Sequence, residues 1–154
     1  MSRPVRAKKM ALAEVPAIDP ITNRSVDPRT NSPYYVERDG VRYAGTHVLL
    51  DIWGAKHLDD VRSVEAILRE AVAAAGATLL RMDLHSFGPG QGITGVAILA
   101  ESHISIHTWP ETGFAAIDIF MCGKCDPYKS IAVIKERFRP TSAQLNEHRR
   151  GAIL

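Results

Sequence analysis

The segment 100–111, AESHISIHTWPE, concentrates hydroxyl, imidazole and carboxylate side chains within twelve residues. It directly follows the short apolar run 96–100, which is typical of a buried strand. Polar groups beside a core strand are hydrogen-bonded or functional, because burying them without partners is costly. In an extended chain, His103, Ser105 and His107 share one face. The pattern therefore indicates either a functional site or a half-exposed strand with a polar outer face.

A second group that could do chemistry is the pair Cys122 and Cys125, which enclose Gly and Lys. Such a pair occurs in thiol-redox sites, where it opens a helix, and as half of a zinc site. Asp126 and Pro127 are typical of a helix start and allow the redox interpretation. The zinc interpretation needs two further ligands, and the available histidines are His47, His85, His103 and His107. No second cysteine pair or finger-type histidine pair follows the cysteines.

The composition is that of a soluble globular protein, with 45% hydrophobic and 23% charged residues. The chain has 154 residues, which is enough for one domain with a sizeable core. A formal net charge of only +2 excludes a general polyanion binder, so we expect no nucleic-acid partner. No apolar run approaches the length of a membrane helix, so we expect no membrane partner. Two cysteines exclude a disulfide scaffold and favour a reducing compartment, which we expect to be the cytoplasm.

Residues 1–44 are expected to form a basic, mostly irregular N-terminal arm. Five of the nine prolines fall in this stretch, and no steady apolar periodicity runs through it. Hydrophobic patterning becomes regular at Gly45. We therefore expect a folded domain over 45–139 and a polar, frayed C-terminal tail over 140–154.

Apolar spacing predicts the elements of this domain. Alternation predicts strands over 46–53, 78–85 and 114–122, and a further run starts at 96–100 and continues through Thr108. A glycine-rich loop is expected over 86–95.

Two helices are predicted. One runs from Asp59 or Asp60 to about Ala75, and the other begins at Asp126-Pro127 with a buried stripe that ends at Phe138. The order β-α-β-β-β-α predicts an α+β fold. We expect a two-layer sandwich, with a mainly antiparallel sheet and the helices packed on one face.

The two chemical segments together resemble a known family. ESHISIHTWPE is followed by FAAIDIFMCG, which places Cys122 twenty residues after Ser102. This combination resembles the bacterial and archaeal S-adenosylmethionine decarboxylase family. The resemblance covers roughly 45–138, from GTHVLLDIWG through AGATLLRMDLHSF, and leaves the arm outside.

The resemblance implies that the chain is made as an inactive proenzyme and cuts itself between Glu101 and Ser102. The Ser102 hydroxyl would attack the Glu101 carbonyl and form an ester by an N→O acyl shift. β-Elimination and hydrolysis would then leave a pyruvoyl group at position 102. By position, His107 matches the family's processing proton acceptor. Thr94 matches a residue, usually Ser, whose hydroxyl assists processing.

For the decarboxylation itself, the resemblance implies that the pyruvoyl carbonyl forms a Schiff base with the substrate amine. Cys122 matches the family's proton donor, whereas Cys125 matches no role. Glu111 matches a carboxylate that binds ribose hydroxyls, and Phe87 matches a ring that stacks on adenine near the sulfonium. The loop FGPGQGITG after Phe87 departs from the family pattern by one extra residue and more glycine.

The leading hypothesis is a pyruvoyl-dependent decarboxylase of spermidine biosynthesis, without a metal ion. We expect a homodimer of cleaved protomers, because a one-sided sheet of this size leaves a face to cover. The same chemistry on L-ornithine or L-arginine is an alternative. A processing-dead partner subunit and a small zinc or thiol-redox module are two others, the last resting on the cysteine pair.

Overall fold

The structure is a computed structural model that describes residues 17–18, 25–26 and 34–153. The chain divides into two units, Met1–Ser32 and Pro33–Leu154. In the described part of the first unit, β1 (Ala17–Ile18) pairs antiparallel with β2 (Ser25–Val26). Most of the predicted irregular arm lies outside the described residues.

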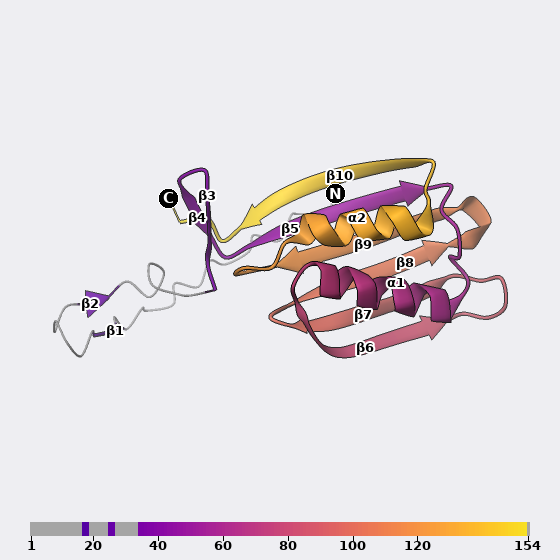
Figure 1. Cartoon of the computed structure of the whole chain (residues 1–154), viewed down its shortest axis with the longest axis horizontal. Coiled ribbons are helices and arrows are strands. Elements are labelled where there is room, and N and C mark those ends of the chain that lie inside the picture. Colours follow the sequence, from indigo (N-terminus) through magenta and orange to yellow (C-terminus); the bar gives the residue numbers. More distant parts are fainter. Residues whose placement is uncertain (1–16, 19–24, 27–33, 154) are drawn as a thin grey trace, which may run out of the picture. The chain divides into compact units, whose positions relative to one another are not determined.

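The second unit is built on a six-stranded sheet in the order β10-β5-β9-β8-β7-β6 (Figure 1). Every neighbouring pair is antiparallel, which confirms the predicted sheet. The strands are β5 (Gly45–Trp53), β6 (Thr78–Ser86), β7 (Ile93–Ala100), β8 (Ser102–Trp109), β9 (Phe114–Met121) and β10 (Ser142–Arg150).

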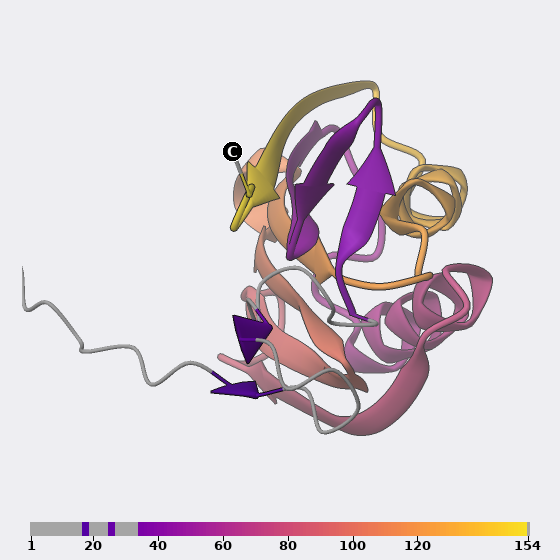
Figure 2. The ribbon, with the colours of Figure 1, turned by 90° about the vertical axis from the view of Figure 1, so that its left-hand side faces the viewer.

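Two helices, α1 (Val61–Ala74) and α2 (Pro127–Phe138), lie side by side on the same face of the sheet (Figure 2). Both begin where an aspartate was predicted to cap them. The Asp60 carboxylate accepts from the backbone N–H of Arg62, and that of Asp126 accepts from Tyr128. The two-layer α+β sandwich is therefore confirmed. No helix within the described ranges has the length and hydrophobicity needed to cross a membrane.

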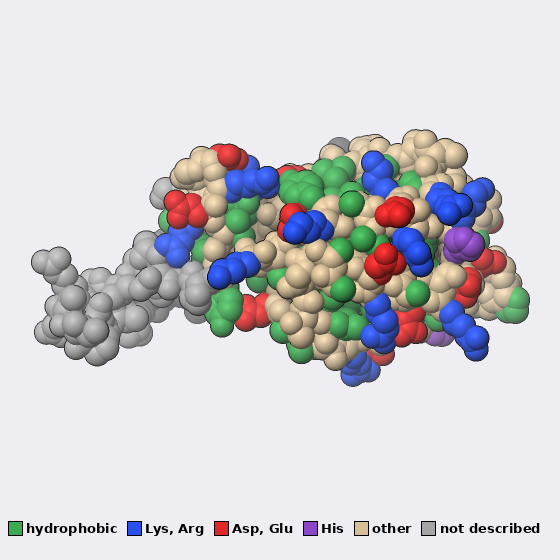
Figure 3. Space-filling model, viewed as in Figure 1, with side chains coloured by type: hydrophobic (Ala, Val, Ile, Leu, Met, Phe, Trp, Pro, Cys, Tyr) green, Lys and Arg blue, Asp and Glu red, His purple; other side chains and the backbone are tan. Residues whose placement is uncertain are grey.

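The core lies between the sheet and the helices. Alternate strand residues, such as Ile104 and Ile106 of β8 and Ile117 and Ile119 of β9, are almost completely buried there. Burying one such side chain contributes about 1.5–3 kcal/mol. On the outside of the helices, acidic and basic side chains are interspersed (Figure 3), as is typical of a solvated surface.

The opposite side of the sheet, which we call the open face, has a different composition. Strand register places these residues on it: His47, Leu49, Asp51 and Trp53 of β5, Thr94, Val96 and Ile98 of β7, His103, Ser105, His107 and Trp109 of β8, and Phe114, Ala116, Asp118 and Phe120 of β9. Three of its large apolar side chains, Trp53, Ile98 and Trp109, are each about 40% exposed.

Four sequence predictions differ from the structure. The run from 96 to 108 is two strands, β7 and β8, because the chain turns back at Glu101. The glycine-rich loop is shorter than 86–95, since β6 includes Ser86 and β7 begins at Ile93.

The largest difference concerns the expected frayed tail. Residues 142–150 form β10, which pairs with β5 over its whole length. An edge strand is held by its backbone hydrogen bonds, so polar side chains such as those of Gln144 and Asn146 do not prevent it from forming. Likewise, residues 36–43 of the expected arm form the hairpin β3 (Val36–Arg38) and β4 (Val41–Tyr43), which belongs to the second unit.

Candidate active site

Ser102 and Cys122 meet at one end of the sheet. Ser102 opens β8 and pairs in register with Met121, the last residue of β9, so Cys122 follows immediately beside it. The backbone N–H of Cys122 donates to Ser102 Oγ at 3.2 Å. The Cys122 thiol donates to the carbonyl oxygen of Glu101 at 2.9 Å and lies 3.5 Å from Ser102 Oγ. One cysteine therefore contacts both partners of the Glu101–Ser102 peptide bond.

The turn between the two strands explains this meeting. β8 and β9 have equal lengths and are joined by the short 3-10 turn η1 (Pro110–Thr112). Gly113 closes the turn at a φ of 65°, a left-handed conformation that favours glycine, and donates to Pro110 O at 3.2 Å. Because two antiparallel strands of equal length are joined by a tight turn, the end of β9 lies beside the start of β8. This places residue 122 next to residue 102.

His107 and Thr94 form a second group, on β8 and β7. They pair in register, and Thr94 Oγ1 lies 3.4 Å from His107 Nε2. A cavity of about 550 Å³ is lined by His107 and by the remaining predicted site residues, Phe87 and Glu111. The Phe87 ring is 58% exposed and meets the His85 ring edge-on at 5.0 Å. The structure thus gathers the predicted substrate-binding residues around the predicted processing histidine.

The two groups lie apart within one chain. His107 follows Ser102 by five residues along a continuous strand, which corresponds to about 17 Å at the usual rise of a strand. Ser102 and Cys122 are therefore at one end of β8, and His107, Thr94, Phe87 and Glu111 are at the other. One copy of the chain does not bring all predicted site residues together.

Between these ends, the open face carries polar groups that the sequence analysis did not assign. Ser105 Oγ donates to Asp118 Oδ2 at 2.9 Å. His47 packs edge-on against Phe120, and its Nδ1 accepts from the Arg150 guanidinium at 3.2 Å, while its Nε2 is buried without a partner. Burial holds the pKa of His47 below its ordinary value. Asp118 was visible in the sequence as the one charge in the apolar strand FAAIDIFM.

Cys125 differs from Cys122 in its surroundings. Its thiol points to the carbonyl of Gly76 at 3.7 Å, and burial together with the nearby Cys122 raises its pKa. A thiol with a raised pKa stays protonated and unreactive near neutral pH. Both cysteines are free, and no cluster of three or more His, Cys, Asp or Glu suited to a metal ion occurs in the part of the chain that the structure describes.

The chain matches the family described as S-adenosylmethionine decarboxylase over residues 46–151, which confirms the resemblance seen in the sequence. The S-adenosylmethionine decarboxylase proenzyme of Thermomicrobium roseum is 45% identical over 111 residues, covering 71% of this chain and 96% of that protein. The proenzyme of Methanococcus maripaludis strain C7 is 45% identical over 116 residues, covering 73% and 94%. The crystal structure of the adenosylmethionine decarboxylase from Aquifex aeolicus matches with a TM-score of 0.65 and 36% identity, covering 71% of this chain and 92% of that one. This chain therefore belongs to the S-adenosylmethionine decarboxylase family.

Proposed function

We propose that the chain is a self-processing, pyruvoyl-dependent decarboxylase that converts S-adenosylmethionine to its decarboxylated form and CO₂, a step toward spermidine. The contact of Cys122 with both Glu101 and Ser102 carries this proposal. The relatives named above are proenzymes of this activity, and no observation favours ornithine, arginine or a processing-dead partner. The free thiols fit a reducing compartment, so we place the enzyme in the cytoplasm.

Self-cleavage begins at Ser102. Its Oγ attacks the Glu101 carbonyl carbon, and the bond from that carbon to the Ser102 nitrogen breaks as the ester forms. The carbonyl oxygen gains negative charge during the attack, and the Cys122 thiol already donates to that oxygen at 2.9 Å. A donor placed where charge develops typically contributes 10²–10³ in rate. Cys122 is therefore an electrophilic aid to cleavage as well as the proposed proton donor in decarboxylation.

The second stage needs a base. Removal of the Ser102 Cα proton breaks the bond from Cβ to the ester oxygen, so fragment 1–101 leaves with a carboxylate at Glu101 and residue 102 becomes dehydroalanine. Hydrolysis of the dehydroalanine then releases its nitrogen as ammonia and leaves the pyruvoyl group at residue 102. That group supplies the electron sink that decarboxylation requires. The residues around position 102 fit a pyruvoyl group, because the side chain that reaches residue 102 among the described contacts is the Cys122 thiol, the proposed proton donor. We assign the base to His107, assisted by Thr94, on the 3.4 Å contact between them.

His107 reaches residue 102 only in a dimer. We propose that two copies meet through their open faces, about a two-fold axis that crosses the strands near Ser105. Such an axis lays the Ser102 end of one copy over the His107 end of the other, so each dimer has two complete sites. The half-exposed Trp53, Ile98 and Trp109 supply apolar surface for the contact.

The cavity beside His107 suits the adenosyl part of the substrate. Phe87 presents a half-exposed ring, and a ring face attracts the sulfonium cation. The Glu111 carboxylate lines the same cavity and is an acceptor for ribose hydroxyls. We assign these two residues to substrate binding.

An intact-mass spectrum of the purified chain tests this function. We expect two fragments, 1–101 and 102–154, with no free amine on the smaller one. The Ser102→Ala chain should stay whole and inactive, whereas Ser105→Ala, which changes a serine on the same strand, should cleave. A whole wild-type chain, or cleavage of Ser102→Ala, would contradict the proposal. CO₂ release from S-adenosylmethionine, compared with ornithine and arginine, then tests the substrate.

A further inference from the structure

The hairpin β3–β4 and the residue that leads into it, Tyr34, precede the region that matches the family, which begins at residue 46. This segment is nevertheless attached to the folded unit. Tyr43, its last residue, is completely buried, and its hydroxyl accepts from Thr46 Oγ1 at 3.3 Å. The hairpin is therefore part of the structure around the site.

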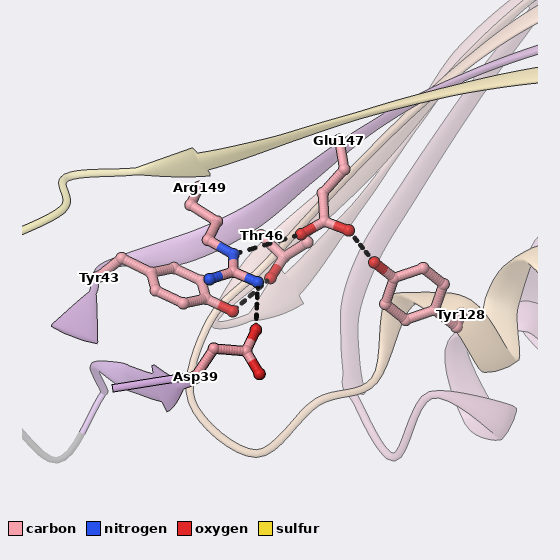
Figure 4. A network of polar contacts seen from close by, with 6 residues as sticks. All are labelled: Asp39, Tyr43, Thr46, Tyr128, Glu147 and Arg149. Atoms are coloured by element: carbon pink, nitrogen blue, oxygen red, sulfur yellow. Dashed lines mark hydrogen bonds and ion pairs between the residues drawn. The ribbon is translucent and has the colours of Figure 1, made fainter. Parts of the chain in front are cut away.

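A polar network fixes the hairpin to β10 and α2 (Figure 4). The Arg149 guanidinium lies 5.4 Å from the Tyr43 ring centre and donates to Asp39 in the hairpin turn at 2.7 Å. Arg149 also pairs with Glu147 at 3.6 Å, and the Tyr128 hydroxyl donates to that same carboxylate. Tyr128 lies in the first turn of α2, just after Cys125. The network thus joins the hairpin to β10 and to α2, the helix that follows the segment 122–125.

Tyr34 contacts this segment directly. The backbone N–H of Gly123, the residue after Cys122, donates to the carbonyl oxygen of Tyr34 at 2.9 Å. Gly123 has a φ of 61°, so the chain turns sharply where this hydrogen bond forms. On its other side the segment is held by the backbone N–H of Asp126, which donates to Ala75 O at 3.1 Å. Tyr34 is therefore the attachment nearest to Cys122.

A small cavity shows what this attachment borders. Its volume is about 240 Å³, and Tyr34 lines it together with Glu101, Cys122 and Lys124. The carbonyl that the Cys122 thiol contacts belongs to Glu101, so the cavity adjoins the bond that the proposed function cuts. Tyr34 thus forms one wall of the space beside the reacting groups.

We infer that Tyr34, held by the hairpin, is a positioning residue for Cys122. Its carbonyl fixes the turn at Gly123, which aims the thiol at the Glu101 carbonyl oxygen, and Tyr34 lines the cavity beside that thiol. This inference rests on the proposed function for its effect on cleavage, but not for the contact itself. A segment outside the family region would then set how fast this chain matures.

The test compares Tyr34→Gly with Tyr34→Phe in the full-length chain. Gly removes the ring and loosens the backbone that carries the carbonyl, whereas Phe keeps both. We expect self-cleavage to slow about tenfold for Tyr34→Gly, as for loss of one well-placed hydrogen bond, and to change less than about twofold for Tyr34→Phe. We expect the thermal unfolding midpoint to stay the same in both variants. A merely structural role of Tyr34 would instead lower the midpoint and leave the cleavage rate of the folded chain unchanged.

A second measurement separates this inference from the proposed function. In the uncut Ser102→Ala chain, iodoacetamide should alkylate Cys122 faster when Tyr34→Gly is added, and not when Tyr34→Phe is added. Equal alkylation rates in the two Tyr34 variants would overturn the inference even if the wild type fails to cleave. If the wild type cleaves, equal cleavage rates in the two variants would overturn it as well. If Tyr34→Gly does not fold, Asp39→Asn, which weakens the contact with Arg149, should move both rates in the same direction by a smaller factor.

Discussion

The two ends of β8 hold their reactive groups in different ways. At the Ser102 end, the contacts involve the backbone: an N–H of Cys122 to the hydroxyl and its thiol to a carbonyl. At the His107 end, a single side-chain contact of 3.4 Å joins His107 to Thr94 beside a large cavity. One end is arranged by the fold of a single chain, and the other end is where we propose that a partner and a substrate bind.

This difference separates two tasks. Strand pairing can hold Ser102 and Cys122 closely because they are neighbours in a hydrogen-bonded ladder. Binding a substrate requires space, and Phe87 and Glu111, the proposed substrate-binding residues, line a cavity. In the proposed dimer, dividing the site between two copies lets one sheet satisfy both requirements.

The largest expected effect comes from mixing two inactive chains. Ser102→Ala and His107→Ala should each form inactive dimers when expressed alone. Because one site of a mixed dimer takes Ser102 from one chain and His107 from the other, co-expression should restore about a quarter of the wild-type activity. CO₂ release from the co-purified chains, with differently tagged copies, measures this. Mixing Ser102→Ala with Cys122→Ala, which change the same end, is the matched control and should restore nothing.

The next effect distinguishes the two cysteines. Cys122→Ala removes the donor from the Glu101 carbonyl, so self-cleavage should slow about a hundredfold without stopping. Turnover of the cleaved enzyme should fall further, by about 10²–10⁴-fold, because the proton donor is lost. Cys125→Ser should change either rate by less than about threefold, since the hydrogen bond of its thiol goes to Gly76 O and not to Glu101 or Ser102. Gel densitometry of cleavage and CO₂ release measure the two steps, and equal losses in both variants would contradict the assignment.

Much of the fold was predictable, because the sequence pattern reports burial. The alternation in FAAIDIFM and the aspartate caps of both helices gave the sheet and the helix layer. The turn at Glu101 was missed, since Ala100, Glu101 and Ser102 include no Gly, Pro, Asn or Asp, and the apolar run before them leads directly into the alternating run after them. β10 was missed because its nine side chains are all exposed, so burial leaves no signal in its sequence.

The chemistry of the site was predictable in kind but not in arrangement. The spacing of Ser102 and Cys122 could indicate a meeting, since antiparallel strands on a short turn return to their start. The resemblance assigned His107 to the same reaction, but five residues of extended chain place it at the far end of the strand. Tyr34 left no signal, because its contact with Gly123 is made by a backbone carbonyl that every residue has.

The smallest expected effect concerns the open face near the Ser102 end, where His47 lies beside Phe120. Arginine can only donate, so the contact with Arg150 requires His47 Nδ1 to be unprotonated and places the ring proton on Nε2. Burial lowers the pKa of His47; Asp118 opposes this, whereas Arg150, His103 and His148 add to it. The folded chain therefore binds this proton less readily than the unfolded chain does.

A lowered pKa in the folded state has a definite sign. The contribution of His47 to the free energy of unfolding is fully present above about pH 6.5, the pKa of His47 in the unfolded chain. This contribution is lost as the pH falls below that value, because the unfolded chain then gains the proton and the folded chain does not. Between pH 7.5 and 5.5, the unfolding free energy should fall less in His47→Gln, which keeps an acceptor for Arg150, than in the wild type. We expect the difference between the two chains to be below about 1 kcal/mol. Urea unfolding at the two pH values measures this. An unchanged or steeper pH dependence in the variant would show that His47 accepts its proton while folded, and that the contact with Arg150 does not hold the ring neutral.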